Sequence, residues 1–119
     1  MTSSRPRWSW LLFPHLSFIV AASVLASCHL LPAVALRGGL DKVGHFLLLG
    51  ALSLLAVAFF GRARWLRVVL VLAALSALEE ASQAWFPART LDAGDLAANL
   101  LGIALGGAIA TRLTRASQR

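Results

Sequence analysis

Acids, amides and one histidine recur at helical spacing in this otherwise apolar sequence. The members of each set are three, four or seven positions apart and therefore share one face of a helix. The sets are Asp41 with His45, Glu80 with Gln83, and Asp92 with Asp95 and Asn99. An imidazole beside carboxylates is suited to general acid or base catalysis. His45 would then be the proton carrier, oriented by Glu80 or Asp95.

Two other kinds of chemistry have weaker support from these residues. Ser76 and Ser82 lie near Glu80 in the sequence, but neither sits in the strained turn motif that frames a nucleophilic serine. His45, Glu80 and Asp95 could together hold a divalent ion, yet the paired histidines typical of metal sites are missing from the sequence. We therefore expect no metal and no cofactor.

The composition identifies the surroundings of these groups. The chain has 119 residues, of which 59% are hydrophobic and 13% charged, whereas ordinary soluble domains have about 45–50% apolar and about 25% charged residues. So much apolar side chain excludes a disordered tail, and the polar residues are too few to cover a large soluble enzyme. The sequence therefore predicts a single-domain membrane protein over residues 1–119.

Four stretches of the sequence are long enough to cross a membrane, because a helix needs ~20 mostly apolar residues to span a core of ~30 Å. The stretches are about 11–33, 43–60, 65–86 and 93–111. Trp65 and Trp85 bracket the third stretch in the manner of interfacial aromatic residues. Since the connections are short, we expect an all-α, up-down-up-down antiparallel four-helix bundle.

Basic residues predict the orientation, because loops kept in the cytoplasm carry the excess of Lys and Arg. Eight of the eleven fall on one predicted side and three on the other. The eight are Arg5, Arg7, Arg62, Arg64, Arg67, Arg112, Arg115 and Arg119, and the three are Arg37, Lys42 and Arg89. Both termini are therefore expected in the cytoplasm. The net charge of +6 then reflects sidedness, and no nucleic-acid partner is expected.

All five acids lie near the outer ends of the predicted helices, so the bundle has one polar end. Ionisable groups are costly in lipid and should face the interior and one another. We expect an outward-facing ligand pocket there, built from Asp41, Lys42, His45, Glu80, Gln83, Arg89, Asp92, Asp95 and Asn99. The competing interpretation is a hydrogen-bond network that only holds three helices in register.

Two basic residues at this end have two interpretations each, and the role of one acid is open. Lys42 and Arg89 could hold a phosphate or carboxylate headgroup at the rim of the pocket, or they could simply neutralise the nearby Asp41 and Asp92. Glu79 lies beside the predicted pocket without sharing the stripe of Glu80. Its role stays open at the level of the sequence.

Small residues recur at every fourth position of the last predicted helix. They are Gly94, Ala98, Gly102, Gly106 and Ala110. A ridge of this kind lets another backbone approach closely. Helix packing within the monomer is the favoured interpretation, and a homodimer through the fourth helix is the alternative.

Cys28 is the only cysteine, so no internal disulfide can form. Residues 25–28 imitate the signal that directs lipid attachment to a bacterial lipoprotein cysteine. Because the apolar segment continues through Leu36, we favour a first span that is neither cleaved nor lipidated.

Three motifs follow one another between residues 41 and 107. They read D-K-x-x-H-F at Asp41–Phe46, E-x-x-Q at Glu80–Gln83, and R-x-x-D-x-x-D-x-x-x-N-x-x-G-x-x-x-G at Arg89–Gly106. In this order and at these separations they resemble the motifs of VanZ-like membrane proteins. Leu49 departs from that family, which often has a Tyr four residues after the histidine.

The resemblance implies a small polytopic envelope protein, of a family whose founding type is linked to reduced susceptibility to the glycopeptide teicoplanin. We expect a multi-pass protein of the bacterial cytoplasmic membrane, surrounded by the lipid bilayer, that binds a membrane lipid or cell-wall precursor. The alternative is a membrane-embedded hydrolase or transferase that acts on a lipid-linked substrate with His45, Glu80 and Asp95. A third function is a structural subunit that docks on a partner through the glycine ridge.

Overall fold

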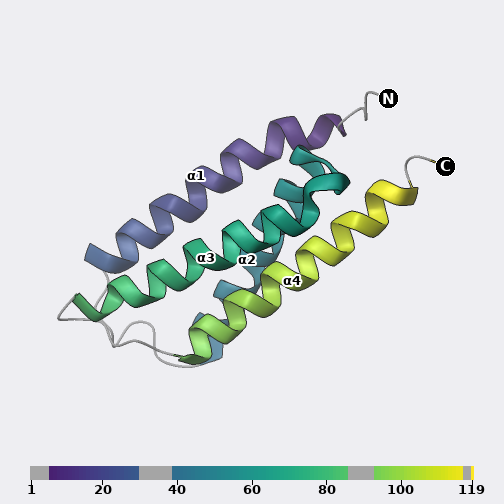
Figure 1. The fold of residues 1–119 in the computed structure, drawn as a ribbon. Helices are drawn as coiled ribbons and strands as arrows, with labels where there is room; N and C mark the ends of the chain where they lie inside the picture. Colours follow the sequence, from purple (N-terminus) through teal and green to yellow (C-terminus); the bar gives the residue numbers. More distant parts are fainter. Residues whose placement is uncertain (1–5, 30–38, 86–92, 117–118) are drawn as a thin grey trace.

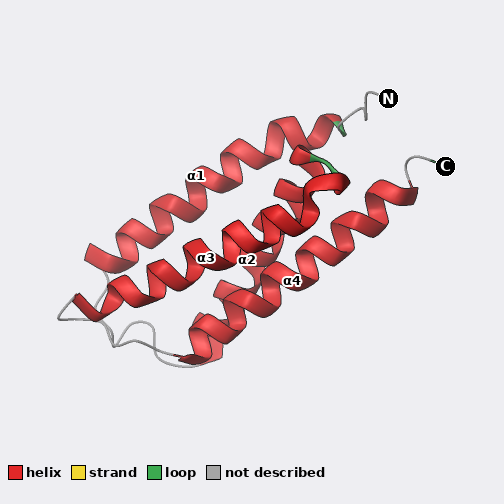
Figure 2. Cartoon of the chain, viewed as in Figure 1, coloured by secondary structure: helices red, strands yellow, loops and turns green. Residues whose placement is uncertain are grey.

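The structure is a computed structural model that describes residues 6–29, 39–85, 93–116 and 119. Within these residues every regular element is a helix, and no strand occurs (Figure 2). The four long helices are α1 (Arg7–His29), α2 (Gly39–Phe60), α3 (Trp65–Ser82) and α4 (Ala93–Ala116), with 3-10 turns η2 (Arg62–Arg64) and η3 (Gln83–Trp85). The predicted all-α class is thus confirmed for this part of the chain.

The predicted spans differ from the helices mainly at their ends. α2 begins at Gly39, four residues before the predicted start at residue 43, and α4 continues to Ala116 beyond the predicted end at 111. Cys28 lies in the last turn of α1. The successive helices run in alternating directions and lie alongside one another, which leaves both ends of the chain at the same end of the molecule (Figure 1).

α2 and α4 form the closest helix pair, because glycines remove the side chains between them. A Cβ atom added at Gly102 would collide with the carbonyl oxygen of Phe46, and one added at Gly106 would collide with that of Gly50. Ser53 Oγ donates a hydrogen bond of 2.7 Å to the Ile103 carbonyl oxygen across the same interface. Small residues and hydroxyls of this kind are typical of helix pairs in membranes.

A short turn joins α2 to α3. Gly61 adopts φ 97°, in the left-handed region that glycine enters without steric cost, and its N–H donates to the Val57 carbonyl oxygen at 2.9 Å. The chain then makes one 3-10 turn and enters α3 at Trp65. This turn places the basic residues of η2 at the same end of the molecule as the N-terminus (Figure 1).

α1 packs on α2 and hardly touches α3. An aromatic cluster near the N-terminal end of α1 makes much of that contact. Phe13 stacks on Phe59 with ring centroids 4.9 Å apart, and Trp10 meets Phe59 edge-on at 5.0 Å. Contacts of this geometry add to the free energy of apolar burial. One side of α1 is therefore held firmly, and its other side borders an opening toward α3.

Large apolar side chains are exposed on the surface of the bundle, while several polar side chains are buried. Phe18, Leu78 and Leu101 are 74%, 66% and 64% exposed, whereas Glu80 and Asn99 are buried. Charged groups are almost never buried in soluble proteins unless they are paired, while in membrane proteins they face the interior. Two segments, Lys42–Phe60 and Ala93–Ala116, are long and apolar enough to cross a membrane. These features are compatible with a membrane protein, and the remaining two predicted spans stay a prediction.

Candidate functional site

Two polar links join α2 to α4 at the end of the molecule away from the chain termini. His45 Nδ1 lies 3.0 Å from Asn99 Oδ1, and Lys42 Nζ lies 3.3 Å from Asp95 Oδ1. The partners on each helix are about one turn apart, so the two links form adjacent rungs. When His45 Nδ1 carries the proton, it donates this hydrogen bond and Asn99 Oδ1 accepts it.

Lys42 therefore has a partner that the sequence did not predict. Its ammonium pairs with Asp95, the next acid on the stripe of α4. The two predicted roles of Lys42, binding a headgroup or neutralising Asp41 and Asp92, stay predictions, because Asp92 and the side chain of Asp41 lie outside the described residues. The Asp95 side chain is 8% exposed and that of Lys42 is 45% exposed. A buried carboxylate without a cation is costly, so Lys42 is what allows Asp95 to face the interior.

On α3 and η3 the acids separate into two environments. Glu79 Oε1 accepts a hydrogen bond of 2.6 Å from Gln83 Nε2, one turn later. Glu80 is 1% exposed and Gln83 is 2% exposed, so both are buried in the helix interfaces. Glu79 is half-buried and borders the cavity described next.

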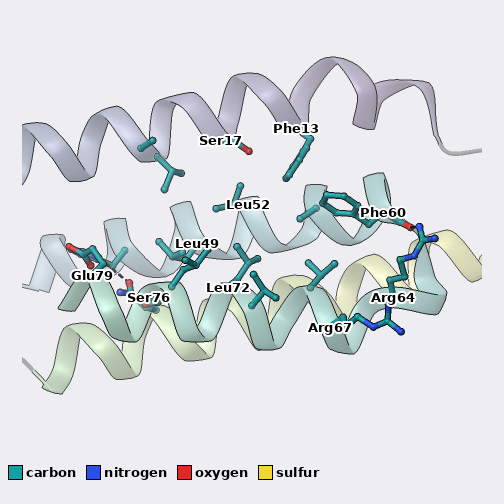
Figure 3. Close-up of a pocket in the computed structure, with 18 residues that line it drawn as sticks. Phe13, Ser17, Leu49, Leu52, Phe60, Arg64, Arg67, Leu72, Ser76 and Glu79 are labelled. Atoms are coloured by element: carbon teal, nitrogen blue, oxygen red, sulfur yellow. Dashed lines mark hydrogen bonds between the residues drawn. The ribbon is translucent and has the colours of Figure 1, made fainter. Parts of the chain in front are cut away.

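A cavity of about 770 Å³ runs between α1, α2 and α3. Figure 3 shows Ser76 and Glu79 near one end, Arg64 and Arg67 near the other, and leucines between them. His45 from α2 and Asn99 from α4 line the same cavity, and no other residue of α4 does. The cavity is therefore an apolar groove with a polar cluster, which we define as His45, Ser76, Glu79 and Asn99.

Ser76 is the least satisfied member of this polar cluster. Its side chain is buried, at 6% exposure, and its hydroxyl has no hydrogen-bond partner among the described residues. A serine inside a helix usually bonds to a carbonyl oxygen of the preceding turn, and leaving a buried hydroxyl unpaired costs about 1–3 kcal/mol. The hydroxyl is thus available to a polar group that enters the cavity.

The three residues predicted to form a catalytic set do not meet in this cavity. His45 lines it, whereas Glu80 and Asp95 are not among its lining residues. Glu79, whose role the sequence left open, takes the place that we expected for Glu80. The reason is the rotation of α3 about its axis, since neighbouring residues of a helix point about 100° apart.

Sequence reasoning missed several lining residues. Ser76 and Glu79 share a helical face with Leu72, and that spacing of three and four was a usable signal. Arg64 and Arg67 were interpreted only as orientation charges, and no sequence pattern assigns them to a cavity.

Some predicted pocket residues lie outside the described residues. They are Arg89, Asp92 and the side chain of Asp41. In the described part of the chain no three His, Cys, Asp or Glu side chains are grouped so that they could hold a metal ion.

The predicted glycine ridge lies against α2 in part. Gly102, Gly106 and Ala110 are buried, while Gly94 and Ala98 are half-buried. Gly102 and Gly106 are in backbone contact with residues 46 and 50 of the same chain. A homodimer through the fourth helix stays a prediction, and it would need a face of α4 that α2 leaves open.

Helices with exposed apolar side chains and a polar cluster at one end are compatible with a helical membrane protein. A comparison with protein-family models makes this specific. The VanZ/LLP1 family model matches residues 3–114. The chain belongs to this family, which confirms the resemblance found in its motifs. No curated protein and no solved structure matches the chain significantly.

Proposed function

We propose that this VanZ/LLP1 protein is a multi-pass membrane protein that binds a lipid or cell-envelope component. The polar cluster of His45, Ser76, Glu79 and Asn99 would hold the polar part of that ligand. The observation that carries the proposal is the buried Ser76 hydroxyl, which lines an apolar cavity and has no hydrogen-bond partner among the described residues. Such a group favours a ligand that brings its own polar atoms.

The shape of the groove supports an amphiphilic ligand. His45 and Phe60 both line it and are fifteen residues apart on α2, which corresponds to ~22 Å along the helix. The wall between them is apolar, with leucines from α2 and α3. An apolar chain fits this wall, and hydroxyl or amide groups of the ligand fit the polar cluster. A serine hydroxyl both donates and accepts hydrogen bonds, and the Glu79 carboxylate accepts them.

In the membrane arrangement that we propose, all four helices cross the bilayer as an up-down-up-down bundle with both termini in the cytoplasm. The polar cluster then opens toward the outer face of a bacterial cytoplasmic membrane, where cell-wall precursors are used. Binding of such a precursor is the route by which the protein would affect susceptibility to teicoplanin.

A reaction is not part of this proposal. The alternative of a membrane-embedded hydrolase or transferase needs His45, Glu80 and Asp95 in one site, and His45 is the member that lines the cavity. Binding requires only the polar cluster and the groove.

Lipid extraction from purified protein tests the proposal. We compare the wild type with Ser76→Ala and Glu79→Gln at matched protein level, and identify by mass spectrometry the lipids and lipid-linked wall precursors that copurify. We expect a lipid-linked species in the wild type that falls several-fold in both variants. Thr111→Val serves as the control, because Thr111 lies on α4 outside the cavity and bonds only within its own helix.

Teicoplanin susceptibility of cells that carry the same variants is the second measurement. If both cavity variants retain the same copurifying species and the same susceptibility as the wild type, the polar cluster serves helix packing alone and the proposal is wrong.

A further inference from the structure

The end of the groove opposite the polar cluster is lined by two guanidinium groups. Arg64 lies in η2 and Arg67 in the first turn of α3, and both border the cavity. Arg64 Nη1 donates a hydrogen bond of 3.2 Å to the Phe60 carbonyl oxygen, at the end of α2. This bond positions the group and uses one of the five N–H donors of an arginine.

Among the residues that the structure describes, no carboxylate forms an ion pair with either arginine. The acids of the chain are Asp41, Glu79, Glu80, Asp92 and Asp95. Glu79 is the acid that lines the same cavity, and it is twelve residues from Arg67 on α3, or ~18 Å along the helix. The ion pair between Lys42 and Asp95, at 3.3 Å, lies at the other end of the groove. Within the described part of the chain, this end of the groove therefore carries two positive charges without an acidic partner.

The groove between the two ends opens to the side. α1 hardly touches α3, and Val71 and Leu75 line the groove although each is 56% exposed. In a bilayer such an opening faces acyl chains, because the helices around it present apolar side chains outward. A lipid can therefore enter between α1 and α3 without crossing a polar barrier.

We propose that this part of the groove is a binding site for an anionic phospholipid. Arg64 and Arg67 bind its phosphate, and one acyl chain lies along Val68, Val71 and Leu72 toward the centre of the molecule. Arginine matches phosphate geometry with two parallel hydrogen bonds, and the apolar wall selects a lipid over a free phosphate. The inference concerns the end away from the polar cluster and holds whether or not the polar cluster binds a ligand.

Charge complementarity also predicts the leaflet. The eight basic residues of the predicted inner side include Arg64 and Arg67, and the cytoplasmic leaflet is the one rich in anionic lipids. The phosphate would thus be bound at the level where anionic headgroups lie.

Native mass spectrometry of the full-length protein in detergent tests the site. Phosphatidylglycerol and phosphatidylcholine with identical acyl chains are the probes. We expect retention of phosphatidylglycerol over phosphatidylcholine by the wild type, and a loss of about tenfold in R64Q/R67Q, since a charge-assisted hydrogen bond contributes at least that factor to binding. R64K/R67K should retain an intermediate amount, because lysine keeps the charge without the planar fork.

R112Q/R115Q is the matched control, because Arg112 and Arg115 are also three residues apart on the same predicted side, are exposed, and do not line the cavity. This variant should bind phosphatidylglycerol like the wild type. Ala21→Phe fills the groove from α1 with an apolar side chain and should reduce retention of both lipids. Glycerol 3-phosphate should not displace the bound lipid. Circular dichroism of each variant verifies that the helices are formed.

Three results would overturn the inference. The first is equal retention of the two lipids by the wild type. The second is a loss of phosphatidylglycerol in R112Q/R115Q as large as that in R64Q/R67Q. The third is displacement of the lipid by glycerol 3-phosphate alone. Ser76→Ala separates this site from the proposed function, because it should lose the ligand of the polar cluster and keep phosphatidylglycerol.

Discussion

Two pairs of polar residues join α2 to α4 in this protein. His45 and Asn99 pair through a hydrogen bond of 3.0 Å, and Lys42 pairs with Asp95 at 3.3 Å. In a low-dielectric interior the cost of breaking such a pair exceeds its net contribution, because one polar partner stays behind. Removing one partner of a pair should therefore destabilise the protein more than removing both partners.

Asn99→Leu should destabilise the protein by about 1–3 kcal/mol, because the part-buried His45 ring would lose its hydrogen-bond partner on α4. The measurement is the unfolding midpoint in detergent followed by circular dichroism. Asn99→Asp keeps an acceptor oxygen and is the comparison. Equal midpoints for Asn99→Leu and the wild type would mean that this hydrogen bond does not hold α2 to α4.

Lys42→Met should be more destabilising than the double variant K42M/D95N. The single change leaves the Asp95 carboxylate, 8% exposed, without its cation, and a buried charge without a partner is costly, whereas the double change removes both charges. The comparison uses the same thermal unfolding measurement. Because the Lys42 side chain is 45% exposed, the intact pair contributes about 1 kcal/mol or less to the free energy of unfolding.

If K42M/D95N is less stable than Lys42→Met, the attraction within the pair, and not the unpaired carboxylate, decides the stability. Asp95→Asn alone completes the cycle and gives the coupling between the two residues.

At the scale of the elements, the contact of α2 with α4 determines how the other helices are arranged. Gly102 and Gly106 lie against the backbone of residues 46 and 50, so the two helix axes approach closely. α3 and α1 then pack around this pair, and the groove remains where α1 and α3 do not meet. The glycines thus shape the cavity without lining it.

Gly106→Ala and Gly44→Ala make a matched pair of substitutions for this contact. A Cβ atom at Gly106 would collide with the Gly50 backbone, while one at Gly44 has nothing within 4 Å. We expect Gly106→Ala to cost about 1–3 kcal/mol through overpacking and Gly44→Ala to be neutral or stabilising by about 0.5–1 kcal/mol through helix propensity.

Yield of folded protein and the unfolding midpoint in detergent measure both variants. A stable Gly106→Ala with an unchanged midpoint would contradict the close approach of α2 to α4.

At the scale of the whole molecule, charge separates along the helices. The η2 turn with Arg62 and Arg64 lies at the end that holds both termini (Figure 1). Ser76 and Glu79 of the polar cluster lie toward the other end (Figure 3). The positive-inside rule then predicts the η2 end in the cytoplasm. This orientation decides which leaflet each end of the groove meets.

Single cysteines on a Cys28→Ser background test the orientation. Ala63 in η2 and Ala93 at the start of α4 are both exposed and lie at opposite ends of the helices. In intact cells a membrane-impermeant maleimide should label Ala93→Cys and should label Ala63→Cys only after permeabilisation. The reverse pattern would place both termini outside and exchange the leaflets of the two proposed sites.

Sequence patterns were sufficient to predict the helices and which residues of one helix share a face. Apolar stretches of the right length predicted four helices, and spacing singled out His45 and Asn99, which lie 3.0 Å apart in the structure. Spacing could not show that Asn99 rather than an acid pairs with His45. The choice between candidates on different helices depends on the separation and rotation of those helices, which no local pattern contains.

The sequence by itself determined the helical class, the family, and the chemical character of each helix face, because these depend on composition, periodicity and motif order. Only the tertiary structure decided that Glu79 and not Glu80 borders the cavity, that Lys42 neutralises Asp95, and that Arg64 and Arg67 close the far end of the groove. The physical reason is that periodicity fixes the angles between residues of one helix, whereas packing against neighbouring helices fixes the rotation of that helix about its own axis.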